Sequence, residues 1–303
     1  PTTTDPVQAL LKRTWEPTLS VTGAEGFPTL QNAGNVLRPY TAFKLSLRLP
    51  PLVDAASCVQ EMKRLLAAGS GCIWQLSRVY RNGECGSRHN PEFSMLEWYR
   101  VGFDHHRLMD EVDDLVDAVL DCGRSRRVTY AALFEEYLGL DIHDCDDADL
   151  AREGLARCDF RGELDRDGWL NLLFSHCIEP QLLQPTMVYA FPASQAALAR
   201  VVDGDDRVPS AARFELFIKG MELANGYFEL TDAEEQARRF EADQQLRERY
   251  QRPVLPTDQR LIGALQHGLP ECAGVALGVD RLVMLALDAS HIDQVIAFTL
   301  QRA

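Results

Sequence analysis

The chain has 303 residues and a formal net charge of −14. This length accommodates one large domain or two modest ones, with roughly three quarters of the unfolded surface buried on folding. The acidic balance argues against tRNA or DNA as the main partner, because nucleic-acid affinity depends on Lys and Arg that neutralise phosphates. The short basic run at 124–127 is expected to be a solvated loop rather than a binding patch.

The eight cysteines contain no Cys-x-x-Cys pair, which excludes zinc-ribbon and thioredoxin-type motifs. We recognise no signal peptide and no apolar run long enough to cross a bilayer. Free thiols in a reducing compartment are the simplest interpretation. The sequence therefore predicts a cytoplasmic protein without a membrane partner.

Residues 1–58 differ in composition from the rest of the chain. Seven of the fifteen prolines lie in the first 54 residues, which carry five basic and four acidic residues, so the excess negative charge lies further on. Prolines this dense interrupt helices and central strands, and we expect a divergent segment of irregular structure. Two explanations stay open, a genuine divergence and the translation of a shifted reading frame. Reading the coding DNA in the other frames distinguishes them.

From residue 59 onward the pattern becomes regular, and we expect a single domain over 59–303. Predicted helices cover 61–68, 106–120, 232–250, 257–267 and 280–287. Predicted strands cover 72–80, 92–101, 188–191, 213–218, 222–230, 275–279 and 294–300. Residues 129–180 are acidic and mostly helical in pattern, which predicts an insertion packed on the sheet. Strands with helices on both flanks predict an α+β fold around an antiparallel sheet.

The most informative segment is RNGECGSRHNPEFSMLEWY, residues 81–99, which joins an arginine, a loop and a strand. Alternate strand residues share a face, so Phe93, Glu97 and Tyr99 line up. A ring, a carboxylate and a phenol on one face favour a mixed pocket, although a half-exposed strand carries such residues about as often. Arg81 at the strand end can grip phosphate or carboxylate oxygens with its guanidinium fork.

A second segment, FELFIKGMELANGYFEL at 214–230, places two carboxylates inside apolar strands. Buried carboxylates are costly unless a cation or metal compensates them, and Mg²⁺ prefers oxygen ligands that it bridges to phosphates. Glu215 and Glu222 are therefore candidate metal ligands, unless they face solvent on edge strands. Asn225 and Glu229 share one face of the second strand.

A third segment, GVALGVDRL at 274–282, reads as a glycine-bearing strand that leads into a helix. We expect Asp280 to cap this helix. Helix N-termini favour anions, and Arg281 adds a full positive charge there. Gly278 allows a ligand to approach the backbone closely. Strand–glycine–helix turns are common, so this segment alone is a weak signal.

Together, in this order and spacing, the three segments resemble the motifs of the class II aminoacyl-tRNA synthetases, lysyl subclass. LEWYR at 96–100, FPASQ at 191–195 and Ala276 are similar to the lysyl-tRNA synthetase paralogues that attach β-lysine to elongation factor P. The resemblance covers about residues 60–303. It implies a class II synthetase-like antiparallel sheet flanked by helices, and a catalytic domain without the domain that reads the anticodon.

The resemblance implies an ATP-dependent ligase that activates (R)-β-lysine as an adenylate and transfers it to a lysine of elongation factor P. Arg81 would hold the α-phosphate and the amino-acid carboxylate, and Arg281 the γ-phosphate. The other implied nucleotide contacts are Glu84, His89, Asn90 and Phe93. The implied substrate contacts are Glu97, Tyr99, Asn225, Glu229, Ala276 and Gly278, and the implied Mg²⁺ ligands are Glu215 and Glu222.

The sequence also departs from the family pattern. Gly83 stands where the family has a glutamate, so Glu84 is expected to replace it, and Val59 stands where a glutamate would bind the substrate amino group. Motif 1, which builds the family's dimer interface, is not recognisable, although the resemblance still implies a homodimer and no tRNA partner. Two other functions stay open: a truncated lysyl-adenylate-forming synthetase with another acceptor, and a non-catalytic synthetase-like binding protein.

Overall fold

The computed structural model describes residues 18–25, 42–48, 71–81, 85–204, 208–249, 257, 259–297 and 299. The chain divides into two compact units, residues 1–68 and 69–303, and each is described by itself. The helix expected over 61–68 lies outside the described residues. None of the helices within the described ranges is long and apolar enough to cross a membrane.

The first unit contains an antiparallel pair of strands. Strand β1 (Thr18–Glu25) pairs with β2 (Ala42–Arg48), with a register shift after Val21. The expectation of irregular structure was therefore wrong for these two segments. Neither strand contains a proline. A high proline count over the whole segment concealed two proline-free stretches that are long enough to pair.

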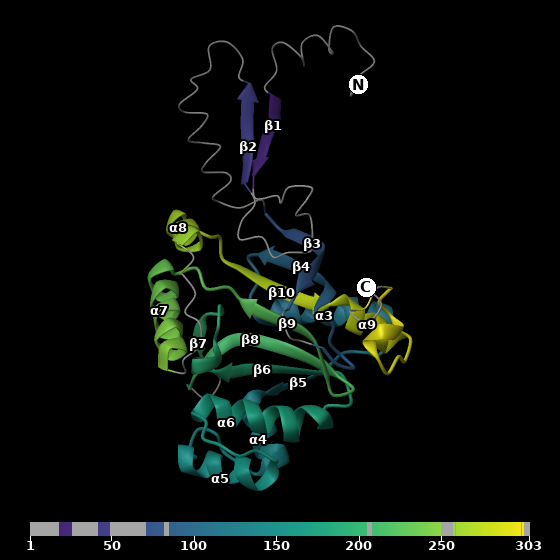
Figure 1. The fold of residues 1–303 in the computed structure, drawn as a ribbon, viewed down its shortest axis with the longest axis vertical. Coiled ribbons are helices and arrows are strands. Elements are labelled where there is room, and N and C mark those ends of the chain that lie inside the picture. The colour runs from purple at the N-terminus through teal and green to yellow at the C-terminus, as the bar shows by residue number, and fades with distance from the viewer. Residues whose placement is uncertain are drawn as a thin grey trace. The chain divides into compact units, whose positions relative to one another are not determined.

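Eight of the described strands form one sheet in the second unit, in the order β3-β4-β10-β9-β8-β6-β5, with β7 beside β8 (Figure 1). Their bounds are β3 (Ile73–Tyr80), β4 (Glu92–Val101), β5 (Arg126–Thr129), β6 (Thr186–Pro192), β7 (Val201–Asp203), β8 (Pro209–Ile218), β9 (Met221–Phe228) and β10 (Cys272–Gly278). All neighbours are antiparallel except β5 with β6. The predicted antiparallel α+β fold is confirmed.

The described helices are α3 (His105–Leu120), α4 (Tyr130–Leu138), α5 (Asp147–Arg157), α6 (Arg166–Leu173), α7 (Ala233–Arg249), α8 (Gln259–His267) and α9 (Val279–Ala286). Single turns are η2 (Phe174–Ile178), η3 (Glu179–Gln181), η4 (Ala193–Gln195) and η5 (Ile292–Gln294). The strand predicted over 294–300 is wrong for the described residues. There His291 and Gln294 form a capping box that favours a helical turn.

Helix α3 covers one face of the sheet. Its apolar stripe of Leu108, Met109, Val112 and Val116 is buried against inward-facing residues of β8, β9 and β10, among them Phe214, Leu216, Val275 and Leu277. Asp104 begins the helix, since its carboxylate accepts a hydrogen bond from the backbone N of Arg107 at 2.8 Å. The opposite face of the sheet, which carries the alternate residues of each strand, is therefore the face free to hold a site.

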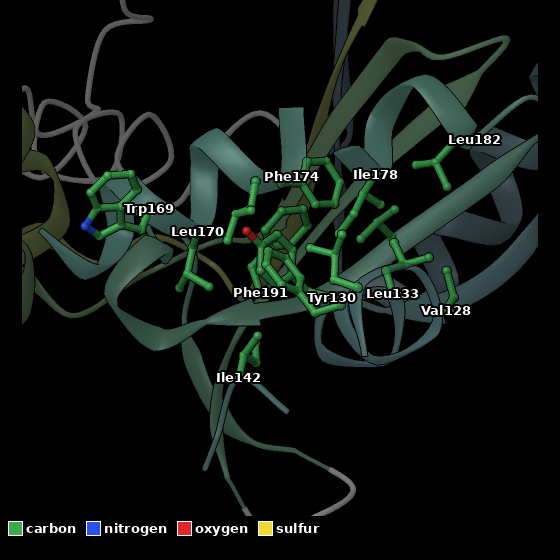
Figure 2. Close-up of a cluster of buried hydrophobic side chains, with 14 of the residues drawn as sticks. Val128, Tyr130, Leu133, Ile142, Trp169, Leu170, Phe174, Ile178, Leu182 and Phe191 are labelled. Atoms are coloured by element: carbon green, nitrogen blue, oxygen red, sulfur yellow. The ribbon is translucent and has the colours of Figure 1, made fainter. Parts of the chain in front are cut away.

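The helices after β5 cover only part of that opposite face. Tyr130 of α4 stacks on Phe174 with ring centroids 5.1 Å apart and packs on Phe191 of β6 at 4.9 Å (Figure 2). Phe217 of β8 joins the same buried cluster. These helices thus pack over the β8–β6–β5 part of the sheet, where Figure 1 shows α4, α5 and α6 gathered. The part formed by β4, β10 and β9 stays uncovered by them.

The three arginines at 124, 126 and 127 each pair with an acidic side chain on the protein surface. Arg124 pairs with Asp114, Arg126 with Glu136 and Arg127 with Asp110. These three guanidinium groups consequently add little net positive potential to the surface. The expectation of a solvated loop was wrong for Arg126 and Arg127, which lie in strand β5.

Candidate active site

A cavity of about 270 Å³ lies over β4, β10 and β9. It is lined by ten of the residues that the sequence singled out: Arg81, His89, Asn90, Phe93, Glu97, Glu222, Asn225, Ala276, Gly278 and Arg281. Tyr99, Glu215 and Glu229 do not line it, and Glu84 lies outside the described residues. Lining residues that the sequence interpretation gave no role include Arg88 and Tyr227, and Asp280, which was expected only to cap a helix, lines the cavity as well.

Strand register brings together residues that are far apart in the chain. Glu97 of β4 stands opposite Ala276 of β10, Ala276 opposite Asn225 of β9, and Asn225 opposite Glu215 of β8. One row across four strands thus runs from the cavity into the protein interior. The alternation seen in each segment is what puts these side chains on a single face.

A second row lies one step along the strands. Tyr99 stands opposite Gly274, Gly274 opposite Tyr227, and Tyr227 opposite Arg213. The central strand β10 presents only small residues to this face, whereas its alternate residues Ala273, Val275 and Leu277 are buried in the core on the other side. A strand with small residues on one face leaves room for a ligand between taller neighbours.

At one end of the cavity the lining is cationic, and we call the set Arg81, Arg88, His89 and Arg281 the cationic end. Arg281 donates from Nη1 to the carbonyl of Glu222 at 2.6 Å and from Nε to the carbonyl of Arg88 at 3.3 Å. Its Nη2 lies 2.7 Å from His89 Nε2. These contacts tie the start of α9 to the loop before β4, and so hold the guanidinium in place.

The expectation that Asp280 caps α9 was wrong. Gly278 is the N-cap residue, and Asp280 lies in the first turn. The Asp280 side chain instead reaches β4, where its Oδ2 accepts a hydrogen bond from the backbone N of Ser94 at 2.6 Å. Asp280 thus anchors the helix start to the strand that carries Phe93 and Glu97.

Arg81 and Arg88 complete the cationic end. The Arg81 guanidinium lies over the ring of Phe93 at 5.4 Å from its centroid, a geometry that favours a cation–π contact. Arg88 donates to the carbonyl of Gly220, in the turn between β8 and β9. The sequence interpretation missed Arg88, although its position directly before His89 was a signal that could have identified it.

The other end of the site is acidic, and we call the set Glu97, Tyr99 and Glu229 the acidic end. Burial raises the pKa of Glu229 to about 7. Burial, then the charges of Glu229 and Glu97, raise the pKa of Tyr99 to about 12. Glu97 accepts a hydrogen bond from Gln75 Nε2 at 2.8 Å. Two carboxylates and a phenol are thus close together in a partly desolvated place, where a cation would be stabilised.

Glu222 and Glu215 lie at different depths. Glu222 lines the cavity and its Oε2 lies 3.7 Å from Arg281 Nη1. Glu215 is buried, pairs with Arg213 and accepts from Asn225 Nδ2 at 3.1 Å. Burial raises the pKa of Glu215, and the Arg213 charge partly offsets this. Glu222 is therefore the accessible carboxylate of the two, and Glu215 is the enclosed one.

The donor set fits a cation only in part. Across the described residues no three His, Cys, Asp or Glu side chains are grouped as metal ligands. Asn225 Oδ1, however, is buried without a hydrogen-bond partner in the described part of the chain, beside the Glu215 carboxylate. An unsatisfied oxygen beside a buried carboxylate suits a hard cation whose remaining ligands come from a bound phosphate.

The cavity can therefore hold an elongated ligand that is anionic at one end and cationic at the other. The guanidinium groups suit phosphate or carboxylate oxygens, and the acidic end suits an ammonium group. The chemistry that fits is positioning and charge neutralisation rather than attack by a side chain.

Comparison with known proteins agrees with this geometry. The family described as tRNA synthetases class II (D, K and N) matches residues 28–302. The chain is 54% identical over 247 residues to "Elongation factor P--(R)-beta-lysine ligase" of Mannheimia succiniciproducens, covering 80% of this chain and 75% of the relative.

Proteins of the same name give similar figures. The Haemophilus influenzae protein (strain PittGG) is 50% identical over 246 residues, and the Vibrio parahaemolyticus protein is 54% identical over 242 residues. These alignments cover 80% and 78% of this chain, and 75% and 74% of the relatives. The family match spans most of the sequence, including all three segments that build the cavity. The chain therefore belongs to the class II tRNA synthetases of the D, K and N type.

Proposed function

We propose that this protein is an ATP-dependent ligase that activates (R)-β-lysine as an adenylate and transfers it to a lysine of elongation factor P. The relatives quoted above carry this activity in their names, and ATP use is implied by the synthetase family. One observation carries the proposal: a single cavity runs from the cationic end to Glu97, and Tyr99 and Glu229 lie close to that carboxylate behind the cavity wall.

The charges suggest how the first step proceeds. A carboxylate oxygen of the amino acid attacks the α-phosphorus, and the bond to the leaving pyrophosphate breaks. Two anions must approach, so Arg81 and Arg281 act by neutralising and orienting them. Opposite charges about 4 Å apart contribute roughly 4 kcal/mol at an effective dielectric near 20. Several such contacts supply a substantial part of the stabilisation that the transition state needs.

Magnesium belongs to the proposal as well. Glu222 would hold the ion at the cavity wall, with Glu215 and the unsatisfied Asn225 Oδ1 behind it. When bound, Mg²⁺ would neutralise phosphate charge that the arginines leave uncompensated.

Substrate choice would come from the acidic end. An ammonium group placed there ion-pairs with Glu97 and Glu229 and accounts for carboxylates that are otherwise costly to bury. An analogue that lacks the ammonium leaves these groups unpaired, which such sites reject by roughly 10⁴-fold. The side chain of a lysine-type amino acid is the proposed occupant.

The acceptor amine must be neutral when it attacks the adenylate, despite a reference pKa of about 10.4 for lysine.

We place this reaction in the cytoplasm, with a protein and not a tRNA as acceptor, and with the ligase as a homodimer. Both the acidic composition and the relatives' names, which print elongation factor P, support a protein acceptor. Light scattering of the purified chain tests the homodimer.

Pyrophosphate exchange with β-lysine and with α-lysine, at varied Mg²⁺ concentration, tests the proposal. Exchange that requires β-lysine and Mg²⁺, followed by a mass increase of elongation factor P, supports it. Exchange with α-lysine alone indicates an adenylate-forming enzyme with another acceptor. Absence of exchange with either isomer indicates a non-catalytic binding protein.

A further inference from the structure

Two glycines of β10, Gly274 and Gly278, bracket Ala276 on the cavity face but have different surroundings. A Cβ atom on Gly278 would meet nothing closer than the Arg281 Cδ at 3.6 Å, which is ordinary contact. A Cβ atom on Gly274 would lie 2.4 Å from the Tyr99 ring and 2.5 Å from Glu229 Oε1. The space above Gly278 is thus open, whereas the space above Gly274 is already filled by the acidic end.

The register explains why this space is filled. Gly274 pairs with Tyr99 of β4 on one side and with Tyr227 of β9 on the other. The backbone N of Glu229 donates to the carbonyl of Cys272 at 3.0 Å, which places Glu229 beside the start of β10. The side chains of Tyr99 and Glu229 therefore come from opposite sides of β10 and pack over the backbone of Gly274, which has no side chain. Ala276 and Gly278 line the cavity but Gly274 does not, so along β10 the cavity ends before Gly274.

We infer that Gly274 is a specificity-determining position, whose missing side chain lets Tyr99 and Glu229 close the acidic end at the depth that fits a lysine-length amine. This rests on the proposed function. Gly274 acts through its two neighbours and is a positioning residue, not a catalytic one. Its effect belongs to recognition of the amine and not of ATP.

The substitution Gly274→Ala measures this effect. The Tyr99 ring and the Glu229 carboxylate would each have to retreat by about 1 Å to reach ordinary contact at 3.4 Å. A displacement of that size in a binding group costs about 100-fold. We expect the KM for β-lysine to rise by about this factor. The kcat and the KM for ATP should stay within about threefold of their values in the unsubstituted chain, because the residues of the cationic end stand on other rows.

The length preference provides a readout that a merely structural role would not change. The preference is the ratio of pyrophosphate exchange with β-lysine to exchange with the homologue that is one methylene shorter. Gly274→Ala should lower this ratio by at least about tenfold, because the depth of a pocket discriminates one methylene by roughly that amount. Gly263→Ala in α8 is the matched control, because its added Cβ meets nothing within 4 Å. An unchanged KM and length preference in Gly274→Ala would overturn the inference.

A second pair of variants separates crowding from general damage to the sheet. In a Tyr99→Ala background the ring is gone and only the contact with Glu229 Oε1 at 2.5 Å remains. Adding Gly274→Ala there should therefore cost less than it does in the unsubstituted chain, and an equal cost in both backgrounds contradicts the inference. If Gly274→Ala alone does not fold, the readout is whether the double variant folds. A double variant that folds supports the inference, and one that does not fold overturns it. Loss of exchange by the unsubstituted chain would reject the proposed function instead.

Discussion

The cationic end and the acidic end of the site are stabilised in different ways. At the cationic end the guanidinium groups of Arg88 and Arg281 already donate to the carbonyls of Gly220, Glu222 and Arg88. At the acidic end burial shifts the pKa values of Glu229 and Tyr99 upward, so that part of the structure is electrostatically costly until a cation arrives. Hydrogen bonds thus preorganise one end, whereas the other end would be relieved by an ammonium group, as the proposed function expects.

The largest expected effect is at the cationic end. Arg281→Ala should lower kcat/KM for pyrophosphate exchange by about 10³-fold, because a preorganised charge at the developing phosphate charge is lost. Arg281→Lys keeps the charge without the fork and should give a smaller loss. A loss of less than about tenfold in Arg281→Ala, with unchanged folding by circular dichroism, would show that this end does not act on phosphate.

The next effect is at the acidic end. Glu229→Gln should raise the KM for β-lysine by about 100-fold, because the neutral amide cannot ion-pair with the ammonium. The KM for ATP should stay the same. The free energy of unfolding at pH 8 should not decrease, since a buried charge is removed in the ligand-free protein. Steady-state exchange measures the KM values, and urea unfolding measures the free energy of unfolding. An equal rise of the KM for ATP and for β-lysine would contradict separate roles for the two ends.

The pH dependence gives a third, smaller effect. The pKa of Glu229 is raised from 4.5 to about 7, so the folded protein binds more protons than the unfolded chain between these values. This group's contribution to stability therefore falls as pH rises from 4.5 to 7 and is constant above. Ammonium binding needs the ionised form, so the KM for β-lysine should rise by about tenfold per pH unit below 7.

Comparing Glu229→Gln with the unsubstituted chain isolates this titration from that of Glu215, whose pKa is also raised. The amide variant should lose the pH dependence of the β-lysine KM between pH 5.5 and 7.5. A profile that is the same in both proteins would assign the titration to another group.

The smallest effect is expected for an arginine outside the cavity. Arg126 pairs with Glu136 while both side chains are largely exposed, at 49% and 41%. Arg126→Ala should therefore change the free energy of unfolding by less than about 1 kcal/mol. Its exchange activity should match that of the unsubstituted chain, which makes it the control for Arg281→Ala. A large loss in Arg126→Ala would show that the overall charge, and not the cationic end, drives binding.

Much of the catalytic unit was predictable because its elements are locally encoded. Strand alternation indicated that Phe93 and Glu97 share a face, and helical spacing indicated α3. The short strands β5 and β7 were not predicted, because three or four residues carry no period. The role of Asp280 was wrongly predicted, since a cap and a contact to another strand look alike in sequence. Arg88 was missed because a loop residue has no periodic signal.

The sequence by itself determined which residue types were available: arginines beside glycines, carboxylates in apolar strands and small residues on β10. Those features follow from local pattern and composition, which need no partner strand. Only the tertiary structure decided that Tyr99 and Glu229 meet above Gly274 and that Glu215 lies behind Asn225. Strand order and register are set by the packing of the whole sheet, so residues more than a hundred positions apart become neighbours only when it forms.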